Sequence, residues 1–358
     1  MHLLGHPLIV APGILFALLS ALLFGASTPL AKLLLGAIDP WMLAGLLYLG
    51  SGVGLGALRL GRRLAGYPAA EAPLRRADLP WLAGVVLAGG AVAPVLLMTG
   101  LTRTPASAGA LLLNLEGLAT MGIAWLVFRE NVDGRLLLGA FAILLGAILL
   151  SWQEGGGALG FGWGAFAIAG ACVAWGIDNN LTGKLSSADP VQIAMVKGLA
   201  AGGVNIGLAL FQGSALPTWP AFLGAGAVGF FGYGLSLVLF VLALRHLGTA
   251  RTGAYFSTAP FVGALLAIVI FGEAVTPGLL AAAALMSLGV YLHLTERHEH
   301  EHRHGALDHE HRHVHDEHHQ HAHSPGDPAG EPHTHPHRHT PMMHKHPHYP
   351  DLHHRHPH

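Results

Sequence analysis

Residues 24–40 read FGASTPLAKLLLGAIDP, and residues 175–190 read WGIDNNLTGKLSSADP. When one-residue gaps are allowed, the two segments share an aromatic-glycine pair, a lysine and an Asp-Pro pair in the same order. Further along, Phe128-Arg129-Glu130 corresponds to Phe271-Gly272-Glu273. The chain therefore contains an internal repeat, and the number of helices in one repeating unit determines the architecture.

Long apolar runs surround these segments. Ten are recognisable, at residues 14–35, 41–58, 80–100, 105–127, 136–152, 161–183, 191–211, 221–244, 250–271 and 277–295. A transmembrane helix needs about 20 apolar residues, and lipid offers no partner for backbone N–H and C=O groups, so these runs predict helices. We therefore expect an all-α membrane protein with ten transmembrane helices.

The repeating unit contains five of these helices. Because five is an odd number, the second copy must enter the membrane with the opposite polarity. Such inverted-topology repeats are common in secondary transporters, whose substrate sites lie near the membrane midplane between the repeats. The predicted organisation is an N-terminal segment at 1–13, a first five-helix repeat at 14–152, a second at 161–295, and a C-terminal tail at 296–358.

The composition agrees with a membrane protein. Charged residues make up 11% of the chain, whereas soluble domains carry about 25%. The formal net charge of −1 argues against a nucleic-acid partner. Cys172 is the single cysteine, which excludes a disulfide framework and a cysteine-based metal site. The chain also lacks a nucleophile elbow and a P-loop, so we expect neither an enzyme nor a nucleotide-driven pump.

The distribution of Lys and Arg predicts the orientation. The connection between the second and third spans carries Arg59, Arg62, Arg63, Arg75 and Arg76. Connections on this side of the membrane hold ten basic residues in all, and those on the opposite side hold only one. The positive-inside rule then places both termini in the cytoplasm. We expect a multi-pass protein of the bacterial inner (plasma) membrane.

The helix-end pattern at residues 260–264, PFVGA, leads to Phe271-Gly272-Glu273, and a degenerate first-half partner ends in Phe128-Arg129-Glu130. With these two copies in an inverted ten-span layout, the chain resembles EamA-type members of the drug/metabolite transporter superfamily over about residues 14–295. The resemblance implies ten helices, a central cavity between the halves, and the export or uptake of small metabolites. It favours export.

The first half departs from the family pattern at the position of Pro260. The corresponding first-half residue is Gly117, and it is preceded by an acid, Glu116. An ionisable group at the bilayer centre costs about 2.5–3.5 kcal/mol on insertion scales and therefore suggests a partner or a water-filled cavity. Hydrocarbon surroundings favour the protonated carboxyl, which suits a proton-coupled carrier that alternates between charged and neutral forms. The alternative is a protonated glutamate that hydrogen-bonds a neighbouring helix. Asn114 lies two residues earlier.

The sixth span contains a second polar group, Asp178-Asn179-Asn180. Three consecutive polar side chains sweep most of a helical turn, so protein surrounds this helix or the helix is irregular. Lys197 lies at a similar depth on the next, antiparallel span, which predicts an ion pair with Asp178, either structural or functional. The predicted substrate or proton pathway comprises Asn114, Glu116, Asp178, Asn179, Asn180, Lys197 and Asn205.

The tail is rich in histidine, with 23 from His298 onward, many as H-x-H repeats. Frequent prolines and few large apolar residues predict disorder over 296–358. Neutral imidazole binds Ni²⁺, Co²⁺, Zn²⁺ and Cu²⁺, so we expect metal binding and no other cofactor; a tolerated repeat expansion is the alternative. The predicted ligands are His298, His300, His302, His304, His309, His311, His313, His315, His333, His335, His337 and His339.

Three functional hypotheses follow. The first is a secondary transporter, by expectation an exporter, of a divalent metal ion (Ni²⁺, Co²⁺ or Zn²⁺) that the tail buffers. The second is an exporter of an organic metabolite or drug, with a regulatory or incidental tail. The third, a membrane-anchored metal sensor or reservoir, is less favoured because ten spans exceed what an anchor needs. The expected partners are the lipid bilayer and the small-molecule or metal-ion substrate, with a homodimer as a further candidate.

Overall fold

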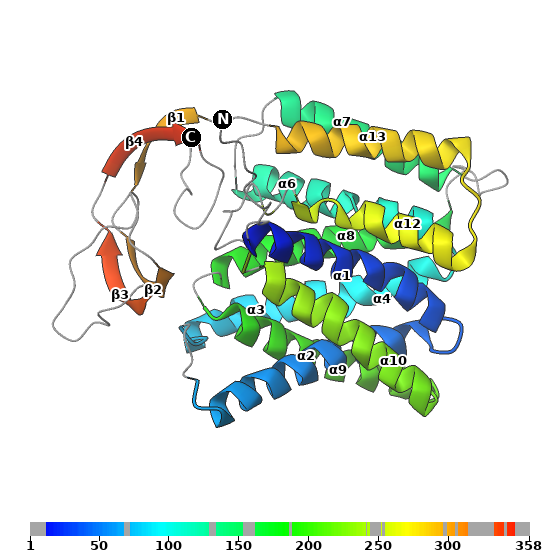
Figure 1. Cartoon of the computed structure of the whole chain (residues 1–358), viewed down its shortest axis with the longest axis horizontal. Helices are drawn as coiled ribbons and strands as arrows, with labels where there is room; N and C mark the ends of the chain where they lie inside the picture. The colour runs from blue at the N-terminus through cyan, green and yellow to red at the C-terminus, as the bar shows by residue number, and fades with distance from the viewer. Residues whose placement is uncertain are drawn as a thin grey trace, which may run out of the picture.

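The computed structural model describes residues 12–67, 72–128, 134–152, 162–185, 188–240, 242–243, 252, 255–295, 299–304, 307–313, 333–339 and 342–347. The two repeats are helical, and short strands occur in the tail (Figure 1). Within these described residues, eight helices are long and apolar enough to cross a membrane. The prediction of a helical membrane protein is therefore confirmed.

The first repeat supplies nine helical elements. They are α1 (Pro12–Leu34), α2 (Pro40–Leu64), η1 (Arg76–Asp78), α3 (Leu79–Val85), η2 (Val86–Val92), α4 (Ala93–Leu101), α5 (Ala106–Leu112), α6 (Leu115–Phe128) and α7 (Gly134–Ser151). The third span is continuous through α3, η2 and α4, and η2 is a π-helix. The fourth span is broken between α5 and α6.

The second repeat follows the same plan. Its elements are α8 (Trp163–Thr182), η3 (Gly183–Leu185), α9 (Pro190–Phe211), α10 (Trp219–Gly229), the π-helix η4 (Phe230–Leu235), α12 (Ala259–Phe271) and α13 (Pro277–Leu294). The span that begins with α10 continues to Phe240. As in the first repeat, a turn interrupts the helix just before α12, at residues 257–258. Both repeats therefore carry a π-segment in the third span and a break in the fourth.

The ten-span count is still a prediction. Two helices that correspond to predicted spans, α8 and α12, are not among the eight that meet the length and hydropathy criteria. In α8 the reason is polarity, because it ends in Asp178-Asn179-Asn180 followed by Leu181 and Thr182. In α12 the reason is length, because the helix begins at Ala259.

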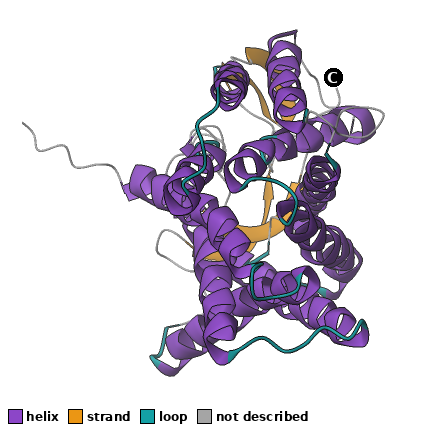
Figure 2. Ribbon diagram, turned by 90° about the vertical axis from the view of Figure 1, so that its right-hand side faces the viewer, coloured by secondary structure: helices purple, strands orange, loops and turns teal. Residues whose placement is uncertain are grey.

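Close backbone contacts hold the repeats together. The helices α2 and α9 lie side by side (Figure 1), and a Cβ at Gly198 would fall within 2.6–2.8 Å of the backbone of Gly52 and Tyr48. Each helix begins with an Asp-Pro pair, in which Asp39 or Asp189 caps the first turn. The last helices of the two repeats, α7 and α13, form another pair at one side of the bundle (Figures 1 and 2).

Glu273 ties the end of α12 to the start of α5. The helix α12 ends at Gly272, whose φ of +62° is a left-handed conformation that suits glycine. The Glu273 carboxylate then accepts hydrogen bonds from Ala106 N at 2.6 Å, Ser107 N at 3.0 Å, and the Ser107 hydroxyl. Glu273 is therefore a structural residue at the end of α12, whereas its counterpart Glu130 lies outside the described residues.

The tail differs from the predicted disorder at four segments. The strand β1 (Glu299–His304) pairs antiparallel with β4 (Met342–Pro347), and β2 (Leu307–His313) pairs antiparallel with β3 (His333–His339). The expectation of disorder over 296–358 rested on composition, which does not register the two-residue period of the H-x-H repeats. That period matches a β-strand, in which alternate residues share a face.

Candidate functional site

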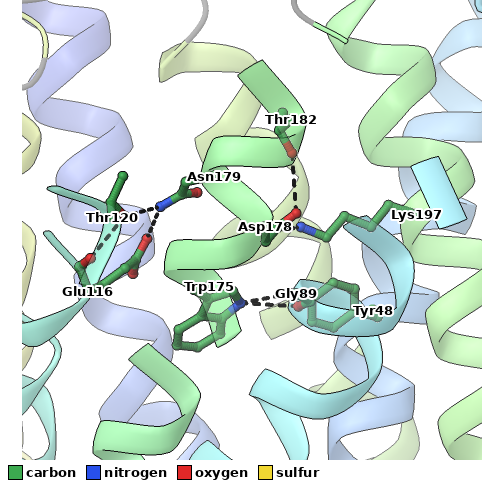
Figure 3. Close-up of polar contacts among 9 residues, drawn as sticks. All are labelled: Tyr48, Gly89, Glu116, Thr120, Trp175, Asp178, Asn179, Thr182 and Lys197. Carbon is green, nitrogen blue, oxygen red and sulfur yellow. Dashed lines mark hydrogen bonds and ion pairs between the residues drawn. The ribbon is translucent and has the colours of Figure 1, made fainter. Parts of the chain in front are cut away.

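The side chain of Glu116 lies at the start of α6, directly after the break in the fourth span. Asn179 on α8 donates from Nδ2 to Glu116 Oε1 at 3.0 Å and to Thr120 Oγ1 at 3.1 Å (Figure 3). Thr120 in turn donates to the Glu116 carbonyl oxygen at 2.9 Å. The unpaired N–H groups and dipole at the start of a helix favour a negative charge. The broken span thus places Glu116 in the first turn of α6, within hydrogen-bonding reach of Asn179 on α8.

This cluster is open rather than sealed. Asn179 is exposed and Glu116 is half-buried, although both belong to predicted transmembrane segments. Behind them α6 and α8 approach closely, since a Cβ at Gly176 would fall within 2.8–2.9 Å of Ala119 Cβ and the Thr120 backbone. A hydrogen bond also links the two helices here, because Asn180 Nδ2 on α8 donates to the Thr120 carbonyl oxygen on α6 at 3.1 Å. An exposed amide and a half-buried acid beside a tight helix contact are expected where a solute or proton has access.

A second polar contact lies on the opposite side of α8. Asp178 forms an ion pair with Lys197 on α9, and Thr182 Oγ1 donates to Asp178 Oδ1 at 3.2 Å (Figure 3). The side chains of Asp178 and Lys197 are only 5% and 17% exposed. The predicted ion pair is present, and its burial means that each charge depends on the other for neutralisation.

The π-helix η2 contributes a backbone acceptor beside this ion pair. The Gly89 carbonyl oxygen accepts from Tyr48 Oη at 2.6 Å and from Trp175 Nε1 at 3.1 Å (Figure 3). A π-turn leaves carbonyl groups available for such partners, because it breaks the regular α-helical hydrogen-bond ladder. A Cβ at Gly89 would overlap the Asp178 carboxylate. Glycine at this position therefore lets η2 approach the ion pair.

Asn114 and Asn205 form hydrogen bonds outside the Glu116 cluster. Asn114 is buried and donates from Nδ2 to the Leu111 carbonyl oxygen at 2.8 Å, within the break between α5 and α6. Asn205 is fully buried and donates to the Gly90 carbonyl oxygen at 3.1 Å, while its Oδ1 has no hydrogen-bond partner among the described residues. The seven predicted pathway residues thus separate into a Glu116 cluster, an ion-pair cluster that extends to Asn205, and Asn114 in the break.

A row of aromatic rings extends from the ion pair across both repeats. The Lys197 ammonium lies 6.0 Å from the centroid of the Tyr48 ring, within range of a cation–π interaction. Tyr48 contacts Tyr233 of η4 at 5.4 Å between centroids, and Tyr233 contacts Phe24 of α1 at 6.1 Å. Phe256 then contacts Phe24 at 5.4 Å. The sequence did not predict the roles of Tyr48 and Gly89, although the Gly-Gly pair at 89–90 was a usable signal.

The predicted tail ligands are placed only by backbone register. His298 and His315 lie outside the described residues. The other ten fall in strands: His300, His302 and His304 in β1; His309, His311 and His313 in β2; and His333, His335, His337 and His339 in β3. In the β2–β3 pair, His309, His311 and His313 stand opposite His337, His335 and His333.

Comparison with known proteins gives concordant findings. A family model described as the EamA-like transporter family matches residues 11–152 and 162–295, one match for each repeat. A protein of Methanothermobacter thermautotrophicus named "Uncharacterized transporter" is 29% identical over 276 residues, covering 73% of this chain and 80% of that protein. A solved structure titled "Crystal structure of protein" matches with a TM-score of 0.57 and 22% identity, covering 78% of this chain and 96% of that chain. This last likeness concerns the fold alone.

Proposed function

We propose that this chain, which belongs to the EamA-like transporter family, exports a small solute in a cycle during which Glu116 gains and loses a proton. Membership of the family makes the protein a multi-pass membrane transporter of a small solute, and the resemblance read from the sequence is confirmed. The family and its named relative point to a transporter rather than an enzyme. Direction, coupling and solute class belong to the proposal.

One observation carries the role of Glu116. Its hydrogen bond from Asn179 joins α6 of the first repeat to α8 of the second, and the pair is accessible from outside the protein. Alternating access moves one repeat against the other. A hydrogen bond to a carboxylate is roughly twice as strong as one between neutral groups. Protonation of Glu116 would therefore loosen a contact between the two moving parts, which is what coupling requires.

We assign the Asp178–Lys197 pair a structural role. Both residues belong to the second repeat, on α8 and α9, so the pair does not have to break when the repeats move. Its burial makes separation of the charges costly. Its function is then to hold α8 and α9 together beneath the backbone of η2 and to fix the position of Asn179 on the other side of α8.

For the solute, the contacts favour an organic molecule. Asp178 is neutralised by Lys197, and Glu116 is engaged by the Asn179 amide. The partly exposed rings of Phe24, Tyr233 and Phe256 offer apolar surface between the repeats. Such a wall suits a solute with apolar or aromatic parts.

A divalent metal ion is the second candidate. The register that sets His309 opposite His337 and His311 opposite His335 supports it, because it pairs histidines across the two strands and imidazole is a common ligand of divalent metal ions. Metal bound at the tail would then be a buffer or a regulator for transport.

For either solute, the proposed location is the bacterial inner membrane, with both termini in the cytoplasm. The distribution of Arg and Lys supports this orientation.

Flux measurements in proteoliposomes test the proposal. Full-length protein is compared with Glu116→Gln and with a truncation after Arg297, using Ni²⁺, Co²⁺, Zn²⁺ and a panel of organic metabolites. We expect an imposed pH gradient to drive organic solute through the full-length protein and the truncation, and Glu116→Gln to reduce this gradient-driven flux at least tenfold. Gradient-driven flux that survives Glu116→Gln would refute the coupling role. If the full-length protein transports metal ions and this flux falls in the truncated protein, the substrate is a metal ion and not an organic solute.

A further inference from the structure

A groove of about 320 Å³ lies between α2 and α9, and none of its lining residues belongs to the predicted pathway. It is lined by Gly56, Arg59, Leu60 and Arg63 of α2 and by Gln192 and Met195 of α9. The α2 residues recur at helical spacing and so form one stripe along its last two turns. The groove is thus a built feature at the Arg-rich end of α2, where the helix leaves the membrane.

The polar end of the groove is held in place by contacts between the repeats. Arg59 Nη1 pairs with Asp189 Oδ2 at 2.9 Å. Gln192 accepts at Oε1 from the backbone N–H of Leu74 at 3.1 Å. Arg63 lies one turn beyond Arg59 and is exposed, and within the described part of the chain its guanidinium has no ion-pair partner. The groove therefore carries two guanidinium groups. Asp189 neutralises that of Arg59, whereas the charge of Arg63 remains available to a ligand.

The other end of the groove is apolar and open. Leu60 is 58% exposed, and Met195 and Gly56 are half-buried. A Cβ at Gly56 would meet only the Met195 side chain, at an ordinary distance of 3.7 Å from Sδ. A cationic mouth that continues into an open apolar channel is complementary to an amphiphile with an anionic head.

We propose that this groove binds an anionic phospholipid, with the headgroup phosphate at Arg63 and Arg59 and an acyl chain along Leu60 and Met195. Basic pockets between transmembrane helices bind anionic headgroups in this way, and arginine offers a planar fork of donors to phosphate oxygens. Because α2 belongs to the first repeat and α9 to the second, the bound lipid would contact both moving parts. The site does not depend on the role of Glu116.

The test is lipid binding by the purified full-length protein, measured by native mass spectrometry and by thermal stability in detergent. Phosphatidylglycerol is titrated against phosphatidylcholine, with inorganic phosphate as a separate probe. We expect Arg63→Gln to weaken phosphatidylglycerol binding about fivefold, as the loss of one arginine near a membrane surface predicts. Arg62→Gln is the matched control, because it removes the same charge one residue away without lining the groove.

Two further variants test the groove itself. Gly56→Leu fills its apolar end, and Leu60→Glu places a negative charge at an exposed position on its wall; each is expected to abolish the preference for phosphatidylglycerol. Equal weakening by Arg62→Gln and Arg63→Gln, or an unchanged preference in both groove variants, would overturn the proposal in favour of diffuse charge attraction. If inorganic phosphate raises the thermal stability as much as phosphatidylglycerol does, the groove binds phosphate and the assignment to a lipid is wrong.

Discussion

Asp178 and Asn179 are consecutive residues of α8, yet their side chains belong to contacts of opposite character. Asp178 faces Lys197 in a buried ion pair within the second repeat, whereas Asn179 is exposed and reaches Glu116 in the first repeat (Figure 3). In the proposed cycle, the buried contact joins parts that move together, and the exposed contact joins parts that move against each other. Residue type alone does not separate the two roles; burial and the identity of the partner helix do.

The largest effect is expected when the buried contact is broken. Lys197→Ala leaves the Asp178 carboxylate buried without a counter-charge, which should cost about 3–5 kcal/mol of unfolding free energy. The measurement is SDS-titrated unfolding in mixed micelles. A double variant, Asp178→Asn with Lys197→Gln, should recover most of the loss because no charge is left unpaired. If Lys197→Ala is as stable as the wild type, the pair is not the scaffold we describe.

A smaller effect is expected at the backbone that covers the ion pair. Gly89→Ala places a Cβ in the space of the Asp178 carboxylate and should cost about 1–3 kcal/mol, the usual penalty for overpacking. Gly203→Ala on α9 is the matched control, since nothing lies within 4 Å of a Cβ there. That control should be neutral or stabilising by up to about 1 kcal/mol. Equal behaviour of the two alanine variants would contradict the close approach of η2.

The exposed contact should respond in function more than in stability. Asn179→Ala removes two hydrogen bonds from Nδ2, and at an exposed position each contributes about 0.5–1.5 kcal/mol at most. We expect a small loss of stability together with a clear loss of pH-driven flux. The informative comparison is Asn179→Ala in the Glu116→Gln background. There the additional loss of coupling should be slight, because both changes act on one contact.

The smallest effect is expected at Thr182, which supports Asp178 through one hydrogen bond at 3.2 Å. Thr182→Val should reduce the unfolding free energy by about 0.5–1.5 kcal/mol and leave pH-driven flux unchanged. The same substitution at Thr120, in the Glu116 cluster, is expected to lower flux instead. Flux loss at Thr182 without flux loss at Thr120 would reverse our assignment of the two contacts.

The repeat, the helical class and the ion pair were predictable because each rests on a simple spacing rule. Asp178 and Lys197 share a depth on antiparallel helices because every residue adds the same rise. The role of Asn114 was not predictable in that way. The sequence suggested one continuous span over 105–127, whereas the structure breaks it at residues 113–114, and the Asn114 side chain donates a hydrogen bond within that break.

The π-helices were missed for a different reason. A π-turn forms when tertiary partners compensate for an irregular hydrogen-bond ladder, and these partners come from distant elements. For η2 they are Tyr48 on α2, Trp175 on α8 and Asn205 on α9. Local composition at residues 86–92 contains only the hint of two adjacent glycines. The interaction that explains the segment is therefore absent from the segment itself.

The matching irregularities in the two halves occupy equivalent positions of the five-helix unit. The π-helices η2 and η4 start 144 residues apart, at Val86 and Phe230, and the breaks at 113–114 and 257–258 have the same separation. Each half therefore departs from α-helical geometry twice, once in its third span and once in its fourth. These departures belong to the repeating unit, since both copies carry them although the two copies differ in sequence.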